Sequence, residues 1–598
     1  MTEKIVKILK SVVSEDIDMG VSASERFGFG HYSSNVAFKL AKLKGKSPLE
    51  VAKELAEKLS TNKEFEKVEA AAPGFINFWL KPEYFQKELG VILKEKEKYG
   101  KNKNLKGQKI LVDYTDPNPF KEFHIGHLMS NAIGESLCRI FEWNGAKVVR
   151  VCYQGDVGLH VAKTIWGILN VLKNNFPDDN ATLQRKINFL GNAYTIGSGA
   201  YDPKDLSGRL PGGPSKEEMV SQIEKIAFQI KDINKKIFYK SDPEINKIYE
   251  KGKKWSLEHF DEVYAKLGTK FDHFILESTV IADGEKIVRE FLNPSASSGR
   301  EKVFEESNGA IIFPGDKYGL HTRVFINSQG LPTYETKDIG LAKKKMSLEK
   351  GLTSSLIVTA NEQNDYFKVV FKALEFIFPE YAKISKHIGH GMLRFASGKM
   401  SSRAGNVITA ESLMAEVEKL VEAKIAEQKL SEKEKKEIKD VVSIGAIKYS
   451  ILRQAIGGDI IFDLEKSISF EGDSGPYLQY AYTRAKSVLE RAGGAGRPST
   501  DGKVKSSLKL MPGEITELET MLCKFSDVVE RSGKEQAPHY IATYLTELAR
   551  VFNAYYAKHK IVDIKDEYSP YKVAITSAFA QVMKNGLEIL GIRVPKKM

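Results

Sequence analysis

The chain has 598 residues, with 90 Lys and Arg against 78 Asp and Glu, and a formal net charge of +12. This length predicts several domains, and the positive balance is compatible with a polyanionic partner such as nucleic acid. No apolar run approaches the roughly 20 residues that span a bilayer, and the charged N-terminus lacks a signal-peptide core. Three scattered cysteines predict neither a disulfide framework nor a zinc site. We therefore expect a cytoplasmic protein with reduced thiols and no membrane contact.

Residues 1–104 are predicted to form a first, α+β unit. Helical patterns at 4–13 and 49–59 precede a strand pair at 68–80, which is signalled by alternating apolar residues around Pro73-Gly74. Strand and helix then alternate, with strands at 109–114 and 147–153 and helices at 125–143 and 159–172. Such alternation predicts a doubly wound parallel sheet, whose ligands bind beyond the carboxyl ends of the strands.

Residues 113–127 lie at one such end and contain the candidate chemistry. His124 and His127 lie three residues apart, at the start of a helix whose free N–H groups attract anions, so the pair is suited to a phosphate. Gly126 lets a flat ligand such as a nucleobase approach the backbone. Three acceptors lie just upstream for a cationic or amide-bearing substrate: Asp113, Asp116 and Asn118.

The remaining chain predicts an insertion, the second half of the sheet and a helical region. Residues 174–308 have no metal-ligand or nucleophile spacing, so we assign them no chemistry. The sheet is expected to resume at 321–326. Thr333 then caps a helix on which Tyr334 and Asp338 share one face. Further strands are predicted at 356–359 and 386–395, and residues beyond 408 are predicted to be helical.

Two segments resemble the signatures of class I aminoacyl-tRNA synthetases, in the form carried by the arginyl-tRNA synthetases. His124-Ile-Gly-His127, with its upstream Pro-Asn and Lys121, resembles the first signature, and Lys399-Met-Ser-Ser-Arg403 resembles the second. Ser402 stands where the family carries a second lysine in that loop, which leaves open whether Arg403 takes its role. The closing Gly-Ile-x-x-Pro-x-x-Met also resembles the family.

The resemblance implies five parts: an N-terminal tRNA-binding domain (1–104), the first Rossmann half (105–173), the insertion (174–308), the second Rossmann half (309–407) and a helical anticodon-binding domain (408–598). It implies ATP-dependent ligation of L-arginine to tRNA(Arg) through an arginyl adenylate, by a monomer. Mg²⁺ is expected to arrive with ATP, and no metal held by the protein itself is expected.

The resemblance also implies roles for individual residues. The expected catalytic residues are Lys121, His124, His127 and Lys399. The arginine site is expected to comprise Asp113, Asp116, Asn118, His127, Tyr334, Asp338 and Gln363, with Asp116 favoured as a turn residue. The ATP site is expected to comprise His124, Gly126, His127, His390, Gly391, Met392, Lys399 and Ser401. Candidate tRNA contacts are Tyr477, Tyr555 and Met598.

Three alternatives remain open. The first is a class I synthetase for another amino acid, against which the acidic residues argue. The second is a small-molecule adenylyltransferase, which leaves the C-terminal helices and the Lys399 loop unexplained. The third is an RNA-binding protein that has lost catalysis, against which the intact His124, His127 and Lys399 argue.

Overall fold

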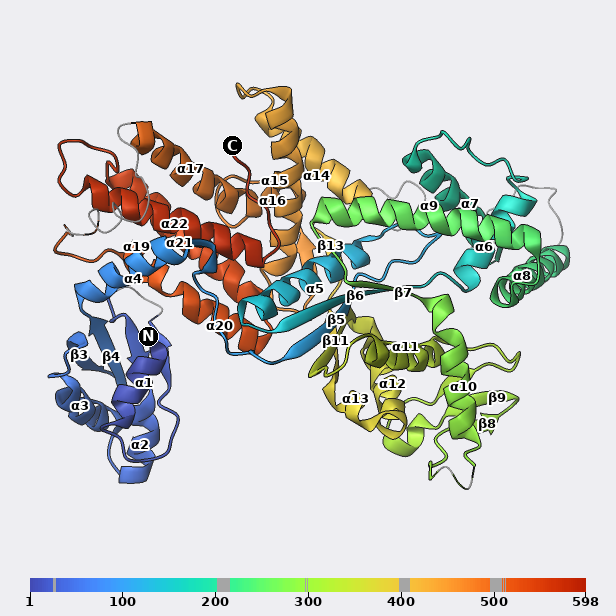
Figure 1. Cartoon of the computed structure of the whole chain (residues 1–598), viewed down its shortest axis with the longest axis horizontal. Helices are drawn as coiled ribbons and strands as arrows, with labels where there is room; N and C mark the ends of the chain where they lie inside the picture. Colours follow the sequence, from blue (N-terminus) through green and yellow to red (C-terminus); the bar gives the residue numbers. More distant parts are fainter. Residues whose placement is uncertain are drawn as a thin grey trace. The chain divides into compact units, whose positions relative to one another are not determined.

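The computed structural model describes residues 1–24, 28–201, 216–295, 297, 299–396, 409–494, 508, 510 and 512–598. These residues form two compact units, one of Met1–Asn104 together with Ser469–Met598 and one of Leu105–Ile468 (Figure 1). None of the helices in these ranges is both long and apolar enough to cross a membrane.

The unit Leu105–Ile468 is built on a five-stranded sheet in the order β12-β11-β5-β6-β7. All neighbouring strands pair in parallel, which confirms the predicted α/β class. The strands are β5 (Lys109–Tyr114), β6 (Lys147–Gln154), β7 (His273–Leu276), β11 (Ser354–Ala360) and β12 (Ser385–His390). The chain runs outward from β5 through β6 to β7, and from β11 to β12 on the other side. The strand order therefore switches between β5 and β11, where ligands bind in such sheets.

Glycines allow the surrounding helices to pack closely. α5 passes over β5, where a Cβ at Gly134 would lie 2.4 Å from the ring of Tyr114. α10 and α11 meet at Gly284 and Gly340, each of which faces backbone of the other helix. The helices that follow the sheet strands are α5 (Ile125–Trp143), α6 (Leu159–Asn170), α10 (Ile281–Leu292), α11 (Tyr334–Leu348), α12 (Asn364–Ile377) and α13 (Pro379–Ile384).

The prediction that residues 321–326 continue the parallel sheet is wrong. β10 (Arg323–Ile326) pairs antiparallel with β9 (Ala310–Phe313), which also pairs with β8 (Glu305–Ser307) in a separate small sheet. The connection between β9 and β10 contains only one short helical turn, η4 (Gly315–Tyr318). So short a connection returns the chain antiparallel, because a parallel crossover needs a dozen or more residues.

The segment expected to be an insertion includes part of the sheet. α7 (Leu183–Tyr201), α8 (Lys216–Tyr239) and α9 (Pro243–Leu267) form a helical cluster that shares one hydrophobic core with α6. The same segment then supplies β7, the edge strand of the parallel sheet, and α10. β7 has only four residues, and the side chain of Phe274 within it is half-exposed. Its sequence therefore lacks the clear apolar pattern of a buried strand.

The unit extends beyond residue 408. α14 (Ala410–Ile425), α15 (Glu432–Leu452) and α16 (Leu464–Ser467) belong to it, as do β13 (Leu393–Phe395) and β14 (Ile460–Phe462), which pair in parallel. The compact unit therefore ends at Ile468, and not at the predicted domain boundary of 408.

The other unit combines an antiparallel sheet with helices. The sheet has the order β1-β2-β4-β3, as expected for the α+β N-terminal part. Its strands are β1 (Val21–Ala23), β2 (Tyr32–Ser34), β3 (Phe65–Ala71) and β4 (Phe75–Leu80), and its helices are α1 (Thr2–Lys10), α2 (Val36–Lys44), α3 (Pro48–Leu59) and α4 (Pro82–Glu95). The predicted C-terminal helices are α17 (Gly475–Gly494), α19 (Glu517–Cys523), α20 (Phe525–Glu535), α21 (His539–Lys558) and α22 (Ser569–Ile589).

Candidate active site

The two histidines lie together at the N-terminus of α5. His124 is the N-cap residue, and the backbone N–H of Gly126 donates to its Nδ1 at 3.1 Å. The backbone N–H of His124 donates in turn to Nδ1 of His127 at 3.2 Å. The two rings stack with their centroids 3.5 Å apart. The expected pairing of His124 and His127 is therefore present.

Both imidazoles are neutral and share one tautomer. Burial, followed by the charge of Lys121, lowers the pKa of His124 to about 4. Burial, His124 and Lys121 lower the pKa of His127 well below its usual value. Because each Nδ1 accepts a backbone hydrogen bond, the hydrogen-bond network assigns the remaining proton of each ring to Nε2. The pair thus offers two Nε2–H donors, with Lys121 as a nearby cation.

Gly126 and the preceding loop fix this arrangement. A Cβ at Gly126 would lie 3.0 Å from Nδ1 of His124, so the ring packs against a position that favours glycine. Thr115, Asp116 and Phe120 have φ of 84°, 47° and 68°, a region that side chains other than glycine rarely adopt. The loop between β5 and the histidines therefore contains backbone strain.

Buried side chains hold the strained turn. Oγ of Ser130 accepts from the backbone N–H of Thr115 at 2.9 Å. Nδ2 of Asn131 donates to Oγ1 of Thr115 at 3.0 Å, and Oγ1 of Thr269 donates to Oδ1 of Asn131 at 3.1 Å. Asp116 accepts from the backbone N–H of Tyr153 on β6 at 2.8 Å, which ties the turn to the neighbouring strand.

One oxygen of the Asp113 carboxylate is paired, and the other, Oδ1, is buried without a hydrogen-bond partner among the described residues. Asp113 is buried at the end of β5, where Nζ of Lys345 on α11 pairs with its Oδ2, and Lys345 is equally buried. This ion pair neutralises the residue that the sequence suggested for binding a guanidinium.

A different carboxylate, Glu277, faces the site and was missed by the sequence analysis. It follows β7 directly, is 1% exposed, and has Nζ of Lys337 2.5 Å from its Oε1. A Cβ at Gly155 would lie 2.3 Å from Oδ1 of Asn118 and 3.1 Å from Oε2 of Glu277, so both groups converge on one glycine. Burial, opposed by Lys337, raises the pKa of Glu277. Within the described ranges, its Oε2 and Oη of Tyr153 are buried and form no hydrogen bond.

Asp338 completes this carboxylate cluster. It lies one turn after Tyr334 on α11, and Oη of Tyr366 donates to its Oδ2 at 2.6 Å. Burial raises the pKa of Asp338 to about 7, with Asp113 and Glu277 adding to the increase. Tyr334 is largely exposed at the start of the helix, where its ring lies 4.8 Å from Nζ of Lys337. Gln363 is exposed at the end of η5 (Asn361–Gln363), immediately before α12.

The expected ATP-binding residues follow β12. His390 is buried, and its Nδ1 donates to the carbonyl of Gly391 at 2.8 Å. The backbone of Met392 is already paired, since its N–H donates to Asp459 and its carbonyl accepts from Ile460. Lys399 and Ser401 lie outside the described residues. After that segment, Thr409 bridges to His124, and the backbone N–H of Ala410 donates to the carbonyl of Phe123 at 2.7 Å.

Family models match nearly the whole chain. Residues 1–80 match the arginyl tRNA synthetase N terminal domain, 88–464 the catalytic domain of tRNA synthetases class I (R), and 478–598 the DALR anticodon binding domain.

The chain belongs to the arginyl-tRNA synthetase family.

Individual relatives agree over their full lengths. The arginine–tRNA ligase of Clostridium acetobutylicum is 31% identical, over 99% of both chains, and that of Clostridium perfringens is 31% identical, over 94% of this chain and 93% of its own. The fold matches the Thermus thermophilus arginyl-tRNA synthetase with a TM-score of 0.75, at 23% identity and covering 100% and 99% of the two chains. The protein is thus an arginine–tRNA ligase that uses ATP.

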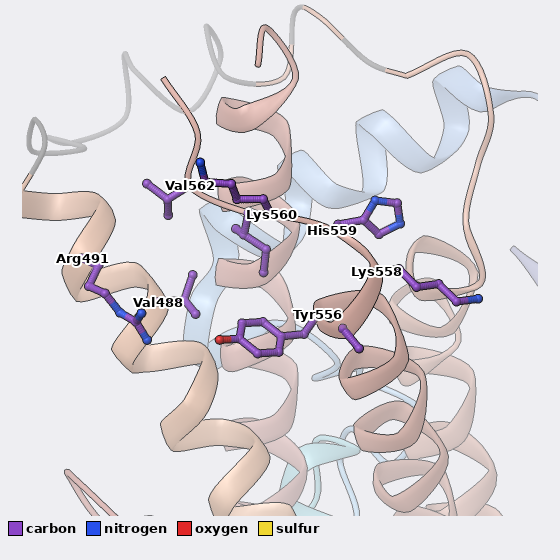
Figure 2. Close-up of a pocket in the computed structure, with 9 residues that line it drawn as sticks. Val488, Arg491, Tyr556, Lys558, His559, Lys560 and Val562 are labelled. Carbon is purple, nitrogen blue, oxygen red and sulfur yellow. The ribbon is translucent and has the colours of Figure 1, made fainter. Parts of the chain in front are cut away.

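The C-terminal helices contain a basic cavity of about 650 Å³. It lies between α17 and the end of α21, where Figure 2 shows the hydroxyl of Tyr556 pointing toward Arg491. The lining residues are Val488, Arg491, Tyr556, Ala557, Lys558, His559, Lys560, Ile561 and Val562. This combination of one aromatic ring with several cations suits a nucleotide.

The three predicted tRNA contacts differ in accessibility. Tyr477 is half-buried, and its Oη accepts from Nδ2 of Asn553 at 3.0 Å. Tyr555 is only 9% exposed and packs against His559, whereas its neighbour Tyr556 lines the cavity. Met598 is half-buried. Of the neighbouring pair Tyr555 and Tyr556, the more accessible ring is therefore that of Tyr556.

Proposed function

We propose that this enzyme activates L-arginine as arginyl adenylate and transfers it to tRNA(Arg) at the site formed by the two histidines and the Glu277 cluster. The proposal depends on one observation. Two neutral imidazoles with Nε2–H donors lie at the carboxyl edge of the parallel sheet, and the same edge carries buried carboxylates that are incompletely hydrogen-bonded. The first group suits phosphates, and the second suits a planar cation.

The phosphate half would stabilise charge in the transition state. The arginine carboxylate attacks the α-phosphorus of ATP, and pyrophosphate leaves. His124 and His127 would donate their Nε2–H groups to the phosphate oxygens, with Lys121 as a cation nearby. Preorganised donors of this kind are typically worth about 3–4 kcal/mol each. Gly126, His390 and Gly391 would line the nucleotide, and Mg²⁺ would arrive on the ATP phosphates.

Lys399 and Ser401 are proposed to act on the departing pyrophosphate, as the second signature implies. Support comes from the first residues described after that segment. Thr409 and Ala410 are hydrogen-bonded to the stretch that contains Phe123 and His124. The chain therefore returns to the histidines ten residues after Lys399.

The carboxylate half would bind the arginine side chain. A guanidinium presents a planar fork of donors, which paired carboxylates can accept from two directions. We assign this role to Glu277 and Asp338, with Asn118 and Oη of Tyr153 as further acceptors. Tyr334 and Gln363, at the exposed rim, would contact the main-chain end of the amino acid near His127. Asp113, whose Oδ1 is buried without a partner while its Oδ2 pairs with Lys345, is assigned as a further acceptor.

Arginine binding would release a proton near neutral pH. Asp338 has a pKa of about 7, so it is partly protonated in the empty site. A guanidinium favours the ionised carboxylate, so binding lowers that pKa. Arginine should therefore bind more tightly as the pH rises through 7.

The C-terminal cavity is proposed to bind an unstacked tRNA base through Tyr556 and its backbone through Arg491, with Tyr477 and Met598 nearby. We further propose that the enzyme acts as a monomer in the cytoplasm. The three buried free cysteines are compatible with a reducing compartment.

A pyrophosphate-exchange assay over all standard amino acids, with tRNA present, tests the proposal. Arginine alone should drive exchange, and labelled arginine should charge total tRNA. Exchange driven by a non-basic amino acid would reject the assignment of the Glu277 cluster.

A further inference from the structure

One side of α9 contacts three separate segments of the active site. α9 is a helix of 25 residues between β6 and β7 (Figure 1). Tyr249, Ser256 and His259 follow one another along it at intervals of seven and three residues, which places them on the same side of the helix. All three side chains are buried. We call these residues the α9 face.

Tyr249 reaches the arginine half of the site through Asp156. Its Oη donates to Oδ2 of Asp156 at 2.6 Å, and Asp156 is fully buried. The same carboxylate accepts from the backbone N–H of Ser278 at 2.8 Å and from its hydroxyl at 2.7 Å. Ser278 follows Glu277 directly in the chain. Asp156 therefore connects Tyr249 to the backbone that carries the Glu277 side chain.

The same side of α9 fixes the turn before the histidines. The backbone N–H of Phe120, at a φ of 68°, donates to Oγ of Ser256 at 3.0 Å. The Phe120 ring stacks on that of Tyr249, with centroids 6.1 Å apart and 14° between the planes. A Cβ at Gly252 would lie 2.2 Å from the Phe120 ring, so this ring packs directly against the helix backbone. Because Lys121 follows Phe120, α9 sets the backbone position of the cation in the phosphate half.

His259 contacts the chain that returns to the histidines. Its Nε2 donates to Oε1 of Glu411 at 2.6 Å, in the first turn of α14. The preceding residue, Ala410, donates its backbone N–H to the carbonyl of Phe123. His259 therefore holds the start of α14 beside the residue that precedes the histidine pair.

The α9 face acts on the substrate-binding groups only through other residues. A misplacement of about 1 Å at a reacting group can cost about 100-fold in rate. A helix fixes positions more precisely than a loop does, because its own hydrogen bonds keep its spacing constant. Tyr249 and His259, ten residues apart, are thereby held about 15 Å from each other.

We propose that Tyr249, Ser256 and His259 are positioning residues for arginine activation. Through them, α9 sets the backbone at Glu277 and the turn at Phe120 from one side. This inference rests on the proposed function, which assigns Glu277 to arginine and the residues after Phe120 to the phosphates. It gives α9, in a segment to which the sequence analysis assigned no chemistry, a role in the first step of the reaction.

Pyrophosphate exchange by the full-length enzyme, with tRNA present, tests the arginine side of the inference. Tyr249→Phe removes the hydrogen bond to Asp156 and keeps the ring that stacks on Phe120. The KM for arginine should rise about tenfold, while kcat stays within about threefold of the wild-type value. Tyr239→Phe removes the hydroxyl of an exposed tyrosine on α8, and this matched control should change neither constant.

The other two residues should show the opposite pattern, because they act on the phosphate half. Ser256→Ala removes the acceptor of the Phe120 N–H, and His259→Ala removes the donor to Glu411. In each variant kcat should fall about tenfold, while the KM for arginine stays within about threefold. His259→Gln, whose side-chain amide can still donate to Glu411, should restore most of kcat.

A double variant tests whether Tyr249 acts through Glu277. In a Glu277→Gln background, Tyr249→Phe should raise the KM for arginine less than about twofold further, because coupled residues are not additive. The same tenfold rise in both backgrounds would overturn the inference. So would an unchanged KM in Tyr249→Phe, or losses of kcat in the alanine variants that match a loss of folded protein measured by circular dichroism. Failure of the proposed function is distinguishable, because the wild-type enzyme would then show no exchange with arginine.

Discussion

The two halves of the active site are built in different ways. The phosphate half comes from one stretch of chain, in which His124 caps a helix and His127 follows one turn later. The proposed arginine half would be assembled from Asn118, Glu277 and Asp338, which lie after β5, after β7 and on α11. Burial acts on both halves with opposite results. It lowers the pKa of both imidazoles, which are therefore neutral donors, and it raises the pKa of the Glu277 and Asp338 carboxyls, to about 7 for Asp338.

This difference predicts that changes in the first half alter the rate and that changes in the second alter arginine affinity. The largest expected effect is that of His124→Asn. Asparagine still caps the helix, so the fold should persist, but the Nε2–H donor is lost. The kcat of pyrophosphate exchange, measured with tRNA present, should fall about 10²–10³-fold. His321→Asn, at an exposed histidine, is the matched control and should change nothing.

Glu277→Gln should act on binding. It removes one charge from a buried ion pair and leaves Lys337 without its partner, a loss typically worth about 2–5 kcal/mol. The KM for arginine should rise about 100-fold or more, while the KM for ATP stays within a few-fold. Glu306→Gln, at an exposed position, serves as the control. An unchanged KM for arginine would remove Glu277 from the pocket.

The pH dependence of the arginine KM sharpens the comparison. With a pKa of about 7, Asp338 is mostly protonated at pH 6 and mostly ionised at pH 8. Because arginine prefers the ionised form, its KM should fall about tenfold between these values. Asp338→Asn should raise the KM and abolish this slope. A slope that survives in the variant would assign the titration to another group.

The smallest effect is expected from changing the buried hydrogen bonds that hold the turn at Thr115. Asn131→Ala removes the hydrogen-bond partner of the Thr115 and Thr269 hydroxyls. This loss should lower the free energy of unfolding by about 1–3 kcal/mol. If Asn131 holds Thr115 at its positive φ, Thr115→Gly should reduce the effect of Asn131→Ala on kcat, because glycine adopts that conformation freely. Exchange rates and urea unfolding of the single and double variants test this coupling. Equal losses of kcat in both backgrounds would contradict it.

The same contrast explains which features could be predicted from the sequence. Paired histidines at a strand-to-helix junction depend on local spacing, so their position and neighbours follow from the chain itself. The ion pair of Asp113 could not be predicted, because its partner, Lys345, lies 232 residues away. A carboxylate at the end of a strand has the same local pattern whether it is free or paired.

Glu277 was missed for a related reason. It follows a four-residue strand inside a segment that was predicted to be an insertion, and Phe274 in that strand is half-exposed. One signal was available: an apolar run, Phe274-Ile-Leu276, that ends in an acidic residue, as the run before Asp113 does. Only the pairing of β7 with β6 places it beside Asn118. Likewise, β10 was assigned to the wrong sheet because pairing direction depends on its connection to β9.

Pyrophosphate exchange by His124→Asn and Glu277→Gln, side by side and with tRNA present, tests most directly whether the two halves have separate roles. At saturating arginine, Glu277→Gln should recover to within about tenfold of the wild-type rate, whereas His124→Asn should remain about 100-fold slower. Recovery of both variants, or of neither, would contradict the division of the site into a phosphate half and an arginine half.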